Sequence, residues 1–232
     1  MYGHPSPDTM VRTEDTGKKF EMGICLAYGI PYDGTYSYTM DLPHQLKPRL
    51  EKLKERFPMC KHTAKRGARY DYTAVEDESL HLSAKSTKKG IGKVAPQVIG
   101  QAQPEEFCRV LEIPYTNVAD LKKYIQDHPT AILPQLVDYT FNCPNLYYNE
   151  EQNSIRYIVL SRPIDWSQYT YEWTRPYDQW TNSCTLKIVT PQGPVALVEF
   201  QFHSRSRTNM AVRWCYETFL TVFKDHLTIE SF

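Results

Sequence analysis

The sequence predicts a mixed α/β (α+β) fold in which helices flank a central mixed β-sheet. Some segments carry apolar residues at helical spacing, whereas others alternate apolar and polar residues as half-buried strands do. Helical and strand patterns do not follow one another in regular alternation, as they would in a doubly wound parallel sheet. The 232 residues, 41% of them apolar, are enough for one domain with its own core. We therefore expect a single domain over residues 1–232.

Helices are predicted where apolar side chains recur three or four residues apart. The segments with this pattern are residues 17–28, 43–56, 105–111, 118–126 and 209–226. The stretch that carries Gln97 and Gln101 is predicted to begin a further helix.

Strands are predicted where apolar and polar residues alternate, at 69–73, 80–86, 155–161, 184–190 and 195–203. An acidic turn, Glu76-Asp77-Glu78, joins the first two. In the second strand Leu82 and Ala84 point to one face, so Ser83 and Lys85 share the other.

Composition excludes several classes of protein. No apolar run reaches the ~18–20 residues that a membrane span needs, and residues 1–12 lack the plan of a signal peptide. We therefore expect a cytoplasmic protein. The six cysteines are scattered without zinc-finger spacing, which favours reduced, buried thiols. The chain contains no phosphate-binding loop Gly-x₄-Gly-Lys-Ser/Thr and no Gly-x-Ser-x-Gly elbow, which makes an ATP-driven enzyme or a serine hydrolase unattractive.

Charge is balanced overall but unevenly distributed. The net charge is zero, which argues against a polycation that coats nucleic acid indiscriminately. Residues 47–95 hold 13 Lys and Arg against 6 Asp and Glu (13 − 6 = +7), and residues 96–190 hold 7 against 11 (7 − 11 = −4). The basic excess surrounds Asp71 and Lys85, and a phosphate backbone favours such surroundings. The alternative is a solvated basic helix and loop.

Asp71 and Lys85 are the residues most indicative of chemistry. Neighbouring strands place an acid and a lysine side by side, as metal-dependent hydrolysis of a phosphodiester requires. The carboxylate holds Mg²⁺ against the phosphate, and the lysine orients or activates the attacking water.

Asp71 followed by Ser83-Ala84-Lys85 resembles the PD-(D/E)XK nuclease superfamily, and most of all its type II restriction endonucleases. There an Asp ends one strand and a (D/E)-x-K tripeptide lies on the next, and the separation here, 83 − 71 = 12 residues, is similar. The resemblance covers residues 15–110 and 195–225 and leaves 112–190 unexplained. It implies a restriction-endonuclease-like core, cleavage of double-stranded DNA at a specific sequence within a restriction system, Mg²⁺ as cofactor, and a homodimer.

The sequence departs from the superfamily at Ser83, where a second carboxylate is expected. A serine hydroxyl is a poorer ligand for Mg²⁺, so another residue must complete the metal shell. The candidates are Glu21 from the first helix, Gln97 and Gln101 as neutral oxygen ligands, and Glu199. The predicted catalytic set is therefore Asp71, Lys85, Ser83, Gln101 and Glu21, and the predicted metal ligands are Asp71, Gln97 and Gln101.

Two further groups are candidates for contacts with DNA. The basic residues around the site are expected to grip phosphates: Lys65, Arg66, Arg69, Lys88 and Lys89. The strand 195–203 and its following loop contribute Gln201, His203 and Arg205. Glu199-x-Gln201, with Asp165 as partner, is an alternative catalytic pair, and an ordinary exposed edge strand is the competing interpretation.

The region 112–190 is predicted to be an insertion or recognition region. Residues 139–180 contain 11 of the chain's aromatic side chains, which stack on bases or pack a subdomain. Two other functions remain open. One is a repair or structure-specific nuclease, and the other is a non-catalytic nucleic-acid-binding protein in which the missing acid at Ser83 marks a degenerate site.

Overall fold

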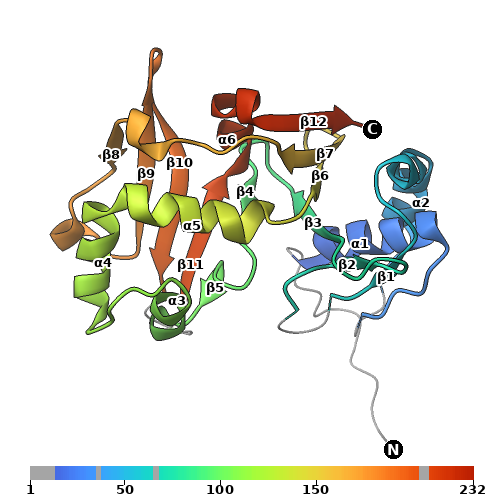
Figure 1. Ribbon diagram of the computed structural model, residues 1–232, viewed down its shortest axis with the longest axis horizontal. Coiled ribbons are helices and arrows are strands. Elements are labelled where there is room, and N and C mark those ends of the chain that lie inside the picture. The colour runs from blue at the N-terminus through green and yellow to red at the C-terminus, as the bar shows by residue number, and fades with distance from the viewer. Residues whose placement is uncertain (1–13, 35–37, 65–67, 204–208) are drawn as a thin grey trace, which may run out of the picture.

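The computed structural model describes residues 14–34, 38–64, 68–203 and 209–232. Within these ranges the strands form two sheets, which Figure 1 shows with the helices packed around them. The mixed α and β class is therefore confirmed, although the strands divide between two sheets instead of forming one.

The first sheet has the strand order β1-β2-β3-β6-β7-β12. Its strands are β1 (Cys60–His62), β2 (Tyr72–Ala74), β3 (His81–Thr87), β6 (Asn145–Asn149), β7 (Ser154–Leu160) and β12 (Leu227–Ser231). β3 and β6 run parallel, and the other neighbours are antiparallel. The sheet is therefore mixed, as predicted.

Helices α1 (Glu14–Tyr28) and α2 (Asp41–Leu50) cover one face of this sheet. Phe20 and Ile24 of α1 are fully buried, and they share a core with Leu82 of β3 and Leu146 of β6. Tyr147, the next residue of β6, belongs to the second core on the opposite face. The alternation of side chains along β6 thus places this sheet between two cores.

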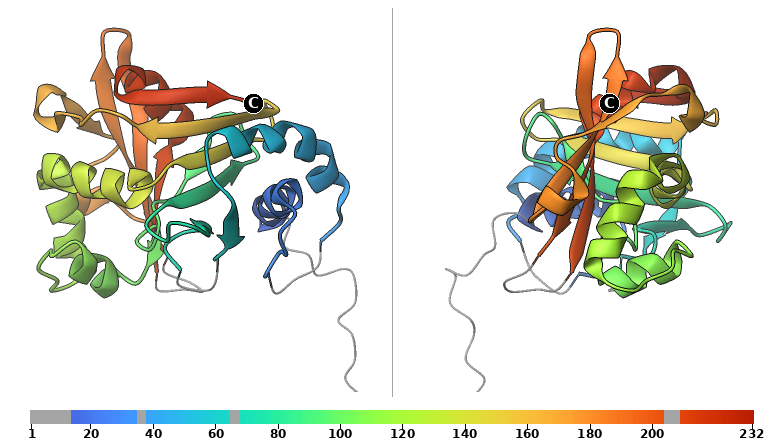
Figure 2. Two further views of the ribbon diagram at one scale, coloured as in Figure 1. Left: turned by 45° about the vertical axis from the view of Figure 1, so that its right-hand side comes forward. Right: turned by 90° about the vertical axis from the view of Figure 1, so that its left-hand side faces the viewer.

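The second sheet has the order β4-β11-β10-β9-β8, and β5 also pairs with β11. Its strands are β4 (Lys93–Val94), β5 (Gln101–Ala102), β8 (Tyr171–Trp173), β9 (Ser183–Thr190), β10 (Gly193–Phe202) and β11 (Met210–Cys215). Helices α3 (Pro104–Val110), α4 (Val118–Asp127), α5 (Pro129–Phe141) and α6 (Tyr216–Val222) complete the fold. In Figure 1, α5 runs across this sheet, and Figure 2 shows the long β9–β10 hairpin from two further sides.

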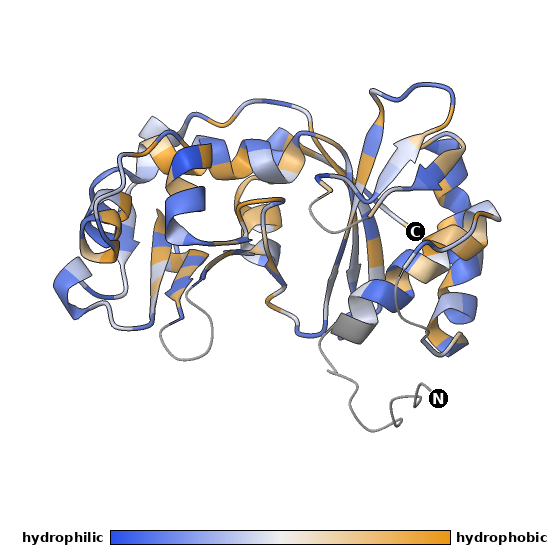
Figure 3. Cartoon of the chain, turned by 90° about the horizontal axis from the view of Figure 1, so that it is seen from below, coloured by the Kyte–Doolittle hydropathy of each residue, from blue (hydrophilic) through white to orange (hydrophobic). Residues whose placement is uncertain are grey.

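One face of the second sheet is apolar and the other is polar. Phe200 of β10 and Trp214 of β11 are buried in the larger core, and the Trp214 indole donates a hydrogen bond to Thr140 of α5 (2.9 Å). Glu199 and Arg213 face each other in register on the opposite face. In the view from below, apolar and polar residues alternate along both the helices and the strands (Figure 3).

Two predicted helices are wrong. Residues 209–226 form β11 followed by the short helix α6, because residues 210–215 fill the place between β10 and β4 as a strand that is buried everywhere except at Arg213. A short, nearly continuous apolar run is hard to assign to a strand or to a buried helix until its neighbours are known.

The stretch with Gln97 and Gln101 is a turn that leads into β5. Val98 has a φ of 61°, which no helix continues through, and Gly100 donates a backbone hydrogen bond to Pro96. A Cβ at position 100 would lie 2.3 Å from the Pro96 carbonyl oxygen, so the turn requires glycine there.

Several other predictions agree with the structure. The remaining helices and strands predicted from the sequence are present, with shifted ends. The six cysteines are unpaired and buried. No helix in the described part of the chain is long and apolar enough to cross a membrane.

The region 112–190 contributes to both sheets. It supplies β6 and β7 of the first sheet and β8 and β9 of the second, together with α4 and α5. Trp166 and Trp180 are buried in the larger core, whereas Tyr177 is exposed. A role of this region in recognition stays a prediction.

Candidate active site

Asp71 directly precedes β2, and backbone hydrogen bonds hold it between two neighbouring chain segments. Its N–H donates to Leu82 (3.2 Å), and its carbonyl accepts from the N–H of Thr63 (2.8 Å). Its carboxylate points at β3, where Oδ2 accepts hydrogen bonds from the Ser83 hydroxyl (3.0 Å) and the Ala84 N–H (2.7 Å). Both bonds end on Oδ2, so they fix the orientation of the carboxylate without engaging Oδ1.

Lys85 lies two residues after Ser83 on β3, so the two side chains share a face. Burial raises the pKa of Asp71, and the nearby charges act in opposite directions: Lys85 lowers this pKa while Glu21 raises it. The net shift is upward. The predicted pair of Asp71 and Lys85 is thus brought together, and a bound cation would favour the ionised carboxylate that burial opposes.

Glu21 reaches the same region from α1. Its side chain is nearly buried, and its carboxylate contacts Lys18 (2.9 Å to each oxygen) and His62 Nε2 (3.3 Å to Oε2). The Tyr72 hydroxyl donates to the Glu21 carbonyl (2.8 Å), which ties α1 to β2 next to Asp71. The structure therefore supplies a second acid beside Asp71 from a residue 50 positions earlier in the chain.

Ser83 is fully buried, and its hydroxyl is engaged by Asp71. A serine in this position orients the Asp71 carboxylate and does not stand in for the absent acid. A catalytic role of Ser83 stays a prediction.

Gln97 is buried close to the pair. Its Nε2 donates to Cys143 Sγ (3.7 Å), and its Oε1 is a buried acceptor without a hydrogen-bond partner among the described residues. Cys143 lies near both residues of the pair. Burial raises the pKa of its thiol to about 11, and the charge of Lys85 lowers this pKa while that of Asp71 raises it. An orphaned buried oxygen requires an explanation, and a cation is one.

Gln101 lies elsewhere. It is exposed on β5, where it pairs with Ala211 of β11. Alternation places it on the polar face of the second sheet, together with Gln201 and Arg213. The structure does not show it beside Asp71.

The donor set fits Mg²⁺ better than a transition metal. In the described ranges, no group of three or more His, Cys, Asp or Glu side chains is arranged to hold a metal ion. Mg²⁺ is typically held by one or two carboxylates and otherwise by water and substrate oxygens. Asp71 and Glu21 supply two carboxylates, and Gln97 Oε1 is a neutral oxygen.

The predicted phosphate-binding residues have different surroundings. Lys65, Arg66 and Arg205 lie outside the described residues. Arg69 is 3.6 Å from Asp138 and stacks over the ring of Tyr139 (4.9 Å). Its contacts link the β1–β2 segment to α5. Lys88 and Lys89 are exposed directly after β3.

The alternative pair on β10 is engaged in ion pairs. Glu199 accepts hydrogen bonds from Lys93 (2.8 Å) and lies 3.6 Å from Arg213, whose guanidinium donates to Gln201 Oε1 (3.0 Å). His203 continues this strand with a backbone bond to Asn209. Asp165 caps a short turn through Ser167 and Gln168. These contacts engage Glu199 and Gln201 with neighbouring side chains, and a catalytic role of this pair stays a prediction.

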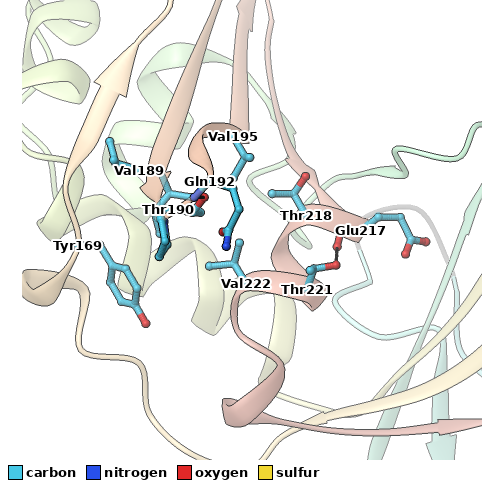
Figure 4. A pocket seen from close by; sticks show the side chains of 11 residues that line it. Tyr169, Val189, Thr190, Gln192, Val195, Glu217, Thr218, Thr221 and Val222 are labelled. Carbon is cyan, nitrogen blue, oxygen red and sulfur yellow. Dashed lines mark hydrogen bonds between the residues drawn. The ribbon is translucent and has the colours of Figure 1, made fainter.

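The structure also contains a groove beside α6, with a volume of about 590 Å³. Figure 4 shows Tyr169, Gln192, Val195 and Val222 around it, with the carboxylate of Glu217 pointing away. None of the residues that line it belongs to the candidate active site.

His62 is the site residue that sequence reasoning missed. It lies on β1 opposite Tyr72, and its side chain is 2% exposed. The strand pattern of residues 60–62 is too short to identify, and nothing in the sequence connects it to Glu21. A buried histidine next to a carboxylate emerges only from the pairing of β1 with β2.

Comparison with known proteins gives one informative match. Over 220 residues the chain is 37% identical to the type II restriction enzyme CviAII of Paramecium bursaria Chlorella virus 1. The match covers 94% of this chain and 62% of that enzyme, so the chain spans less than two thirds of its relative. No protein-family model matches the chain, and no solved structure is significantly similar to it.

Proposed function

We propose that this chain is a type II restriction endonuclease that uses Mg²⁺ to hydrolyse double-stranded DNA at a specific sequence. The observation that carries the proposal is the convergence of Asp71 and Lys85 on adjacent strands, with the Asp71 carboxylate held by Ser83 and Ala84. The similarity to a type II restriction enzyme along 94% of the chain supports the same function.

In this proposal Asp71 Oδ1, Glu21 and Gln97 Oε1 hold the metal. When bound there, Mg²⁺ supplies a Lewis acid for the phosphoryl oxygen and lowers the pKa of water. Ser83 and the Ala84 N–H keep Asp71 in one orientation throughout. The PD-(D/E)XK superfamily is the assignment that this arrangement favours.

Lys85 positions the attacking water and stabilises negative charge on the phosphate. The water oxygen forms a bond to phosphorus and gives its proton to solvent or to a neighbouring base. The P–O bond to the leaving sugar oxygen breaks, and that oxygen takes a proton from solvent water. General acid–base and electrostatic contributions of one such side chain are typically worth about 10²–10⁴-fold in rate.

DNA is the partner that the charge distribution favours. The sequence between residues 47 and 95 carries an excess of basic residues, and such charge supplies the salt-dependent part of DNA affinity. The described Lys88 and Lys89, together with Gln201 and His203, are candidate DNA contacts. A homodimer follows from the proposal, because a palindromic sequence is matched by two-fold symmetry of the protein.

The decisive experiment is incubation of the purified chain with plasmid DNA of known sequence, with Mg²⁺ or with EDTA. We expect discrete fragments with Mg²⁺ alone and intact plasmid with EDTA. Lys85→Met is expected to reduce the cleavage rate by about 10²–10⁴-fold, and Asp71→Ala combined with Lys85→Ala is expected to abolish it. The matched control is Lys187→Met, because Lys187 lies on the second sheet away from the described site residues.

Other outcomes point to the other functions. Cleavage by the double variant would refute the assigned site. A smear without preferred fragments, or cleavage of flaps and ends, would indicate a repair or structure-specific nuclease. Mg²⁺-independent binding without cleavage would indicate a non-catalytic nucleic-acid-binding protein.

A further inference from the structure

We propose that His62 is a positioning residue that holds the Glu21 carboxylate in place for the metal through a single, fixed tautomer. The inference rests on the proposed function, in which Glu21 is the second acid of the metal site. It concerns a residue that does not touch the DNA or the reacting atoms.

The hydrogen bonds of the imidazole define its tautomer. The backbone N–H of Asp33 donates to His62 Nδ1 (3.2 Å), so Nδ1 is the acceptor and carries no proton. The ring N–H is therefore on Nε2, which faces Glu21 Oε2 at 3.3 Å. A histidine ordered in this way can only donate to the carboxylate.

The surroundings keep the ring from turning. The His62 side chain is 2% exposed, and its ring lies between those of Tyr32 (5.0 Å) and Tyr72 (5.3 Å). Tyr72 also donates to the Glu21 carbonyl, so the same tyrosine fixes both the ring and the helix that carries the acid. His62 and Glu21 are thus ordered relative to each other by the fold.

Lys18 is the other partner of Glu21, and it has a different character. Its ammonium lies 2.9 Å from both carboxylate oxygens, but its side chain is 39% exposed. A lysine so exposed can move away when a divalent cation approaches, whereas His62 cannot. The neutral donor on Oε2 therefore remains when Glu21 binds metal, and it fixes which oxygen is presented.

Outer partners of this kind typically contribute about 10–100-fold to metal affinity or activity. The test uses two substitutions that separate the two hydrogen bonds of the ring. His62→Asn can still accept from Asp33 through Oδ1 but has no donor at the position of Nε2. His62→Gln places an amide N–H near that position.

The measurement is the Mn²⁺ or Mg²⁺ concentration that gives half-maximal cleavage of plasmid DNA, together with the rate at saturating metal. Mn²⁺ binding to the DNA-free protein is followed in parallel by electron paramagnetic resonance. We expect His62→Asn to raise the half-saturating concentration by about 10-fold or more, with a smaller effect on the saturated rate. His62→Gln is expected to restore metal binding towards the native value.

A double-substitution cycle excludes a merely structural effect. If His62 acts through Glu21, then His62→Asn has no further effect on metal dependence in a Glu21→Gln background. Thermal unfolding of each variant without metal shows whether the variant is folded. If His62→Asn lowers stability, its effect on metal dependence is still judged from Glu21→Gln with and without His62→Asn, because a structural effect would appear in both backgrounds.

The results distinguish this inference from the proposed function. If the native chain neither cleaves DNA with metal nor binds Mn²⁺, the proposed function fails and the inference fails with it. If the native chain cleaves but His62→Asn leaves its metal dependence unchanged, or weakens metal binding equally in the Glu21→Gln background, only the role of His62 is refuted.

Discussion

At the scale of single residues, Asp71 meets two opposing requirements. Its carboxylate accepts hydrogen bonds from Ser83 and Ala84, which favour the ionised form, but burial opposes that form and prevails, so the pKa of Asp71 is raised. A carboxylate buried in this way destabilises the fold while it is charged, and groups with perturbed pKa values concentrate at functional sites.

The first prediction follows from this balance. The pKa of Asp71 is higher in the folded state than in the unfolded chain. Protonated Asp71 therefore stabilises the fold below the unfolded pKa, and this stabilisation is lost as pH rises through the folded pKa. We therefore expect metal-free Asp71→Asn to unfold at a higher temperature than the native chain at pH 8 and to lose this advantage as pH falls. It should be inactive in cleavage.

Thermal unfolding followed by circular dichroism between pH 4 and pH 8 measures the effect. Asp178→Asn, at an exposed position, is the control and should leave the unfolding temperature unchanged. A lower unfolding temperature of Asp71→Asn at pH 8 would mean that the two hydrogen bonds outweigh burial.

At the scale of elements, a buried hydrogen bond joins α5 to the second sheet, in addition to their shared apolar core. Thr140 Oγ1 accepts the indole N–H of Trp214 (2.9 Å) and donates to the Leu136 carbonyl (2.6 Å). Both Thr140 and Trp214 are fully buried. The contact orients α5, which in turn contacts the site through Asp138 and Arg69.

Thr140→Val tests this attachment. Valine keeps the shape but leaves the Trp214 N–H without a partner, which typically costs about 1–3 kcal/mol. In a chain of this size each kcal/mol lowers the unfolding temperature by about 2–4 °C. Thr130→Val, exposed on the same helix, is the matched control, and equal effects of the two substitutions would contradict the proposed role of this hydrogen bond.

A second attachment joins β7 to α6. Arg156 forms an ion pair with Glu217, which also accepts from Asn149 (2.9 Å). Burial by itself raises the pKa of Glu217, but the hydrogen bonds from Arg156 and Asn149 and the charge of Arg156 outweigh it, and the net pKa is lowered.

Glu217→Gln gives a prediction that depends on pH. A lowered pKa in the folded state means that the stabilisation is present above the unfolded pKa, about 4.3, and is lost as pH falls through the lower folded value. We expect Glu217→Gln to be less stable than the native chain at pH 7 by about 1–3 kcal/mol, and the difference to shrink in acid. Denaturant titrations at several pH values measure it, with the exposed Glu172→Gln as control. A difference that stays constant down to pH 3 would show that the charge of Glu217 is not what stabilises the contact.

At the scale of the whole molecule, the proposed activity requires two sites for two strands. In the proposed activity, a chain with one Asp71–Lys85 pair would cut one strand at a time, and a palindromic sequence would be cut through both strands by a pair of chains. The basic excess between residues 47 and 95 favours binding of each chain to the phosphate backbone.

Mixed dimers test this arrangement. Native chains and Asp71→Asn chains carrying different tags are co-expressed, and the mixed species is purified through both tags. We expect it to convert supercoiled plasmid to the nicked circle, while the native pair yields linear DNA. Linear product at the native rate from the mixed species, or failure to recover any species with both tags, would argue against a dimer that cuts one strand per chain.

The amino-acid sequence by itself determines the features that depend on the spacing of residues within one strand or helix. Alternation over residues 80–86 places Ser83 and Lys85 on one face, and the helical spacing of residues 17–28 predicts α1. These features depend on the geometry of a single element, which the order of side chains specifies. The candidate acid Asp71, the lysine and Glu21 as a possible third member can therefore be named from the sequence alone.

Tertiary structure decides the features that depend on contacts between different strands and helices. Residues 210–215 form a strand because β10, β4 and β5 offer hydrogen bonds on both sides. Gln97 turns inward while Gln101 lies on a distant face, since a tight turn separates them. The contact of His62 with Glu21 joins residues 41 positions apart, and contacts of that kind follow from packing between elements, which no local pattern records.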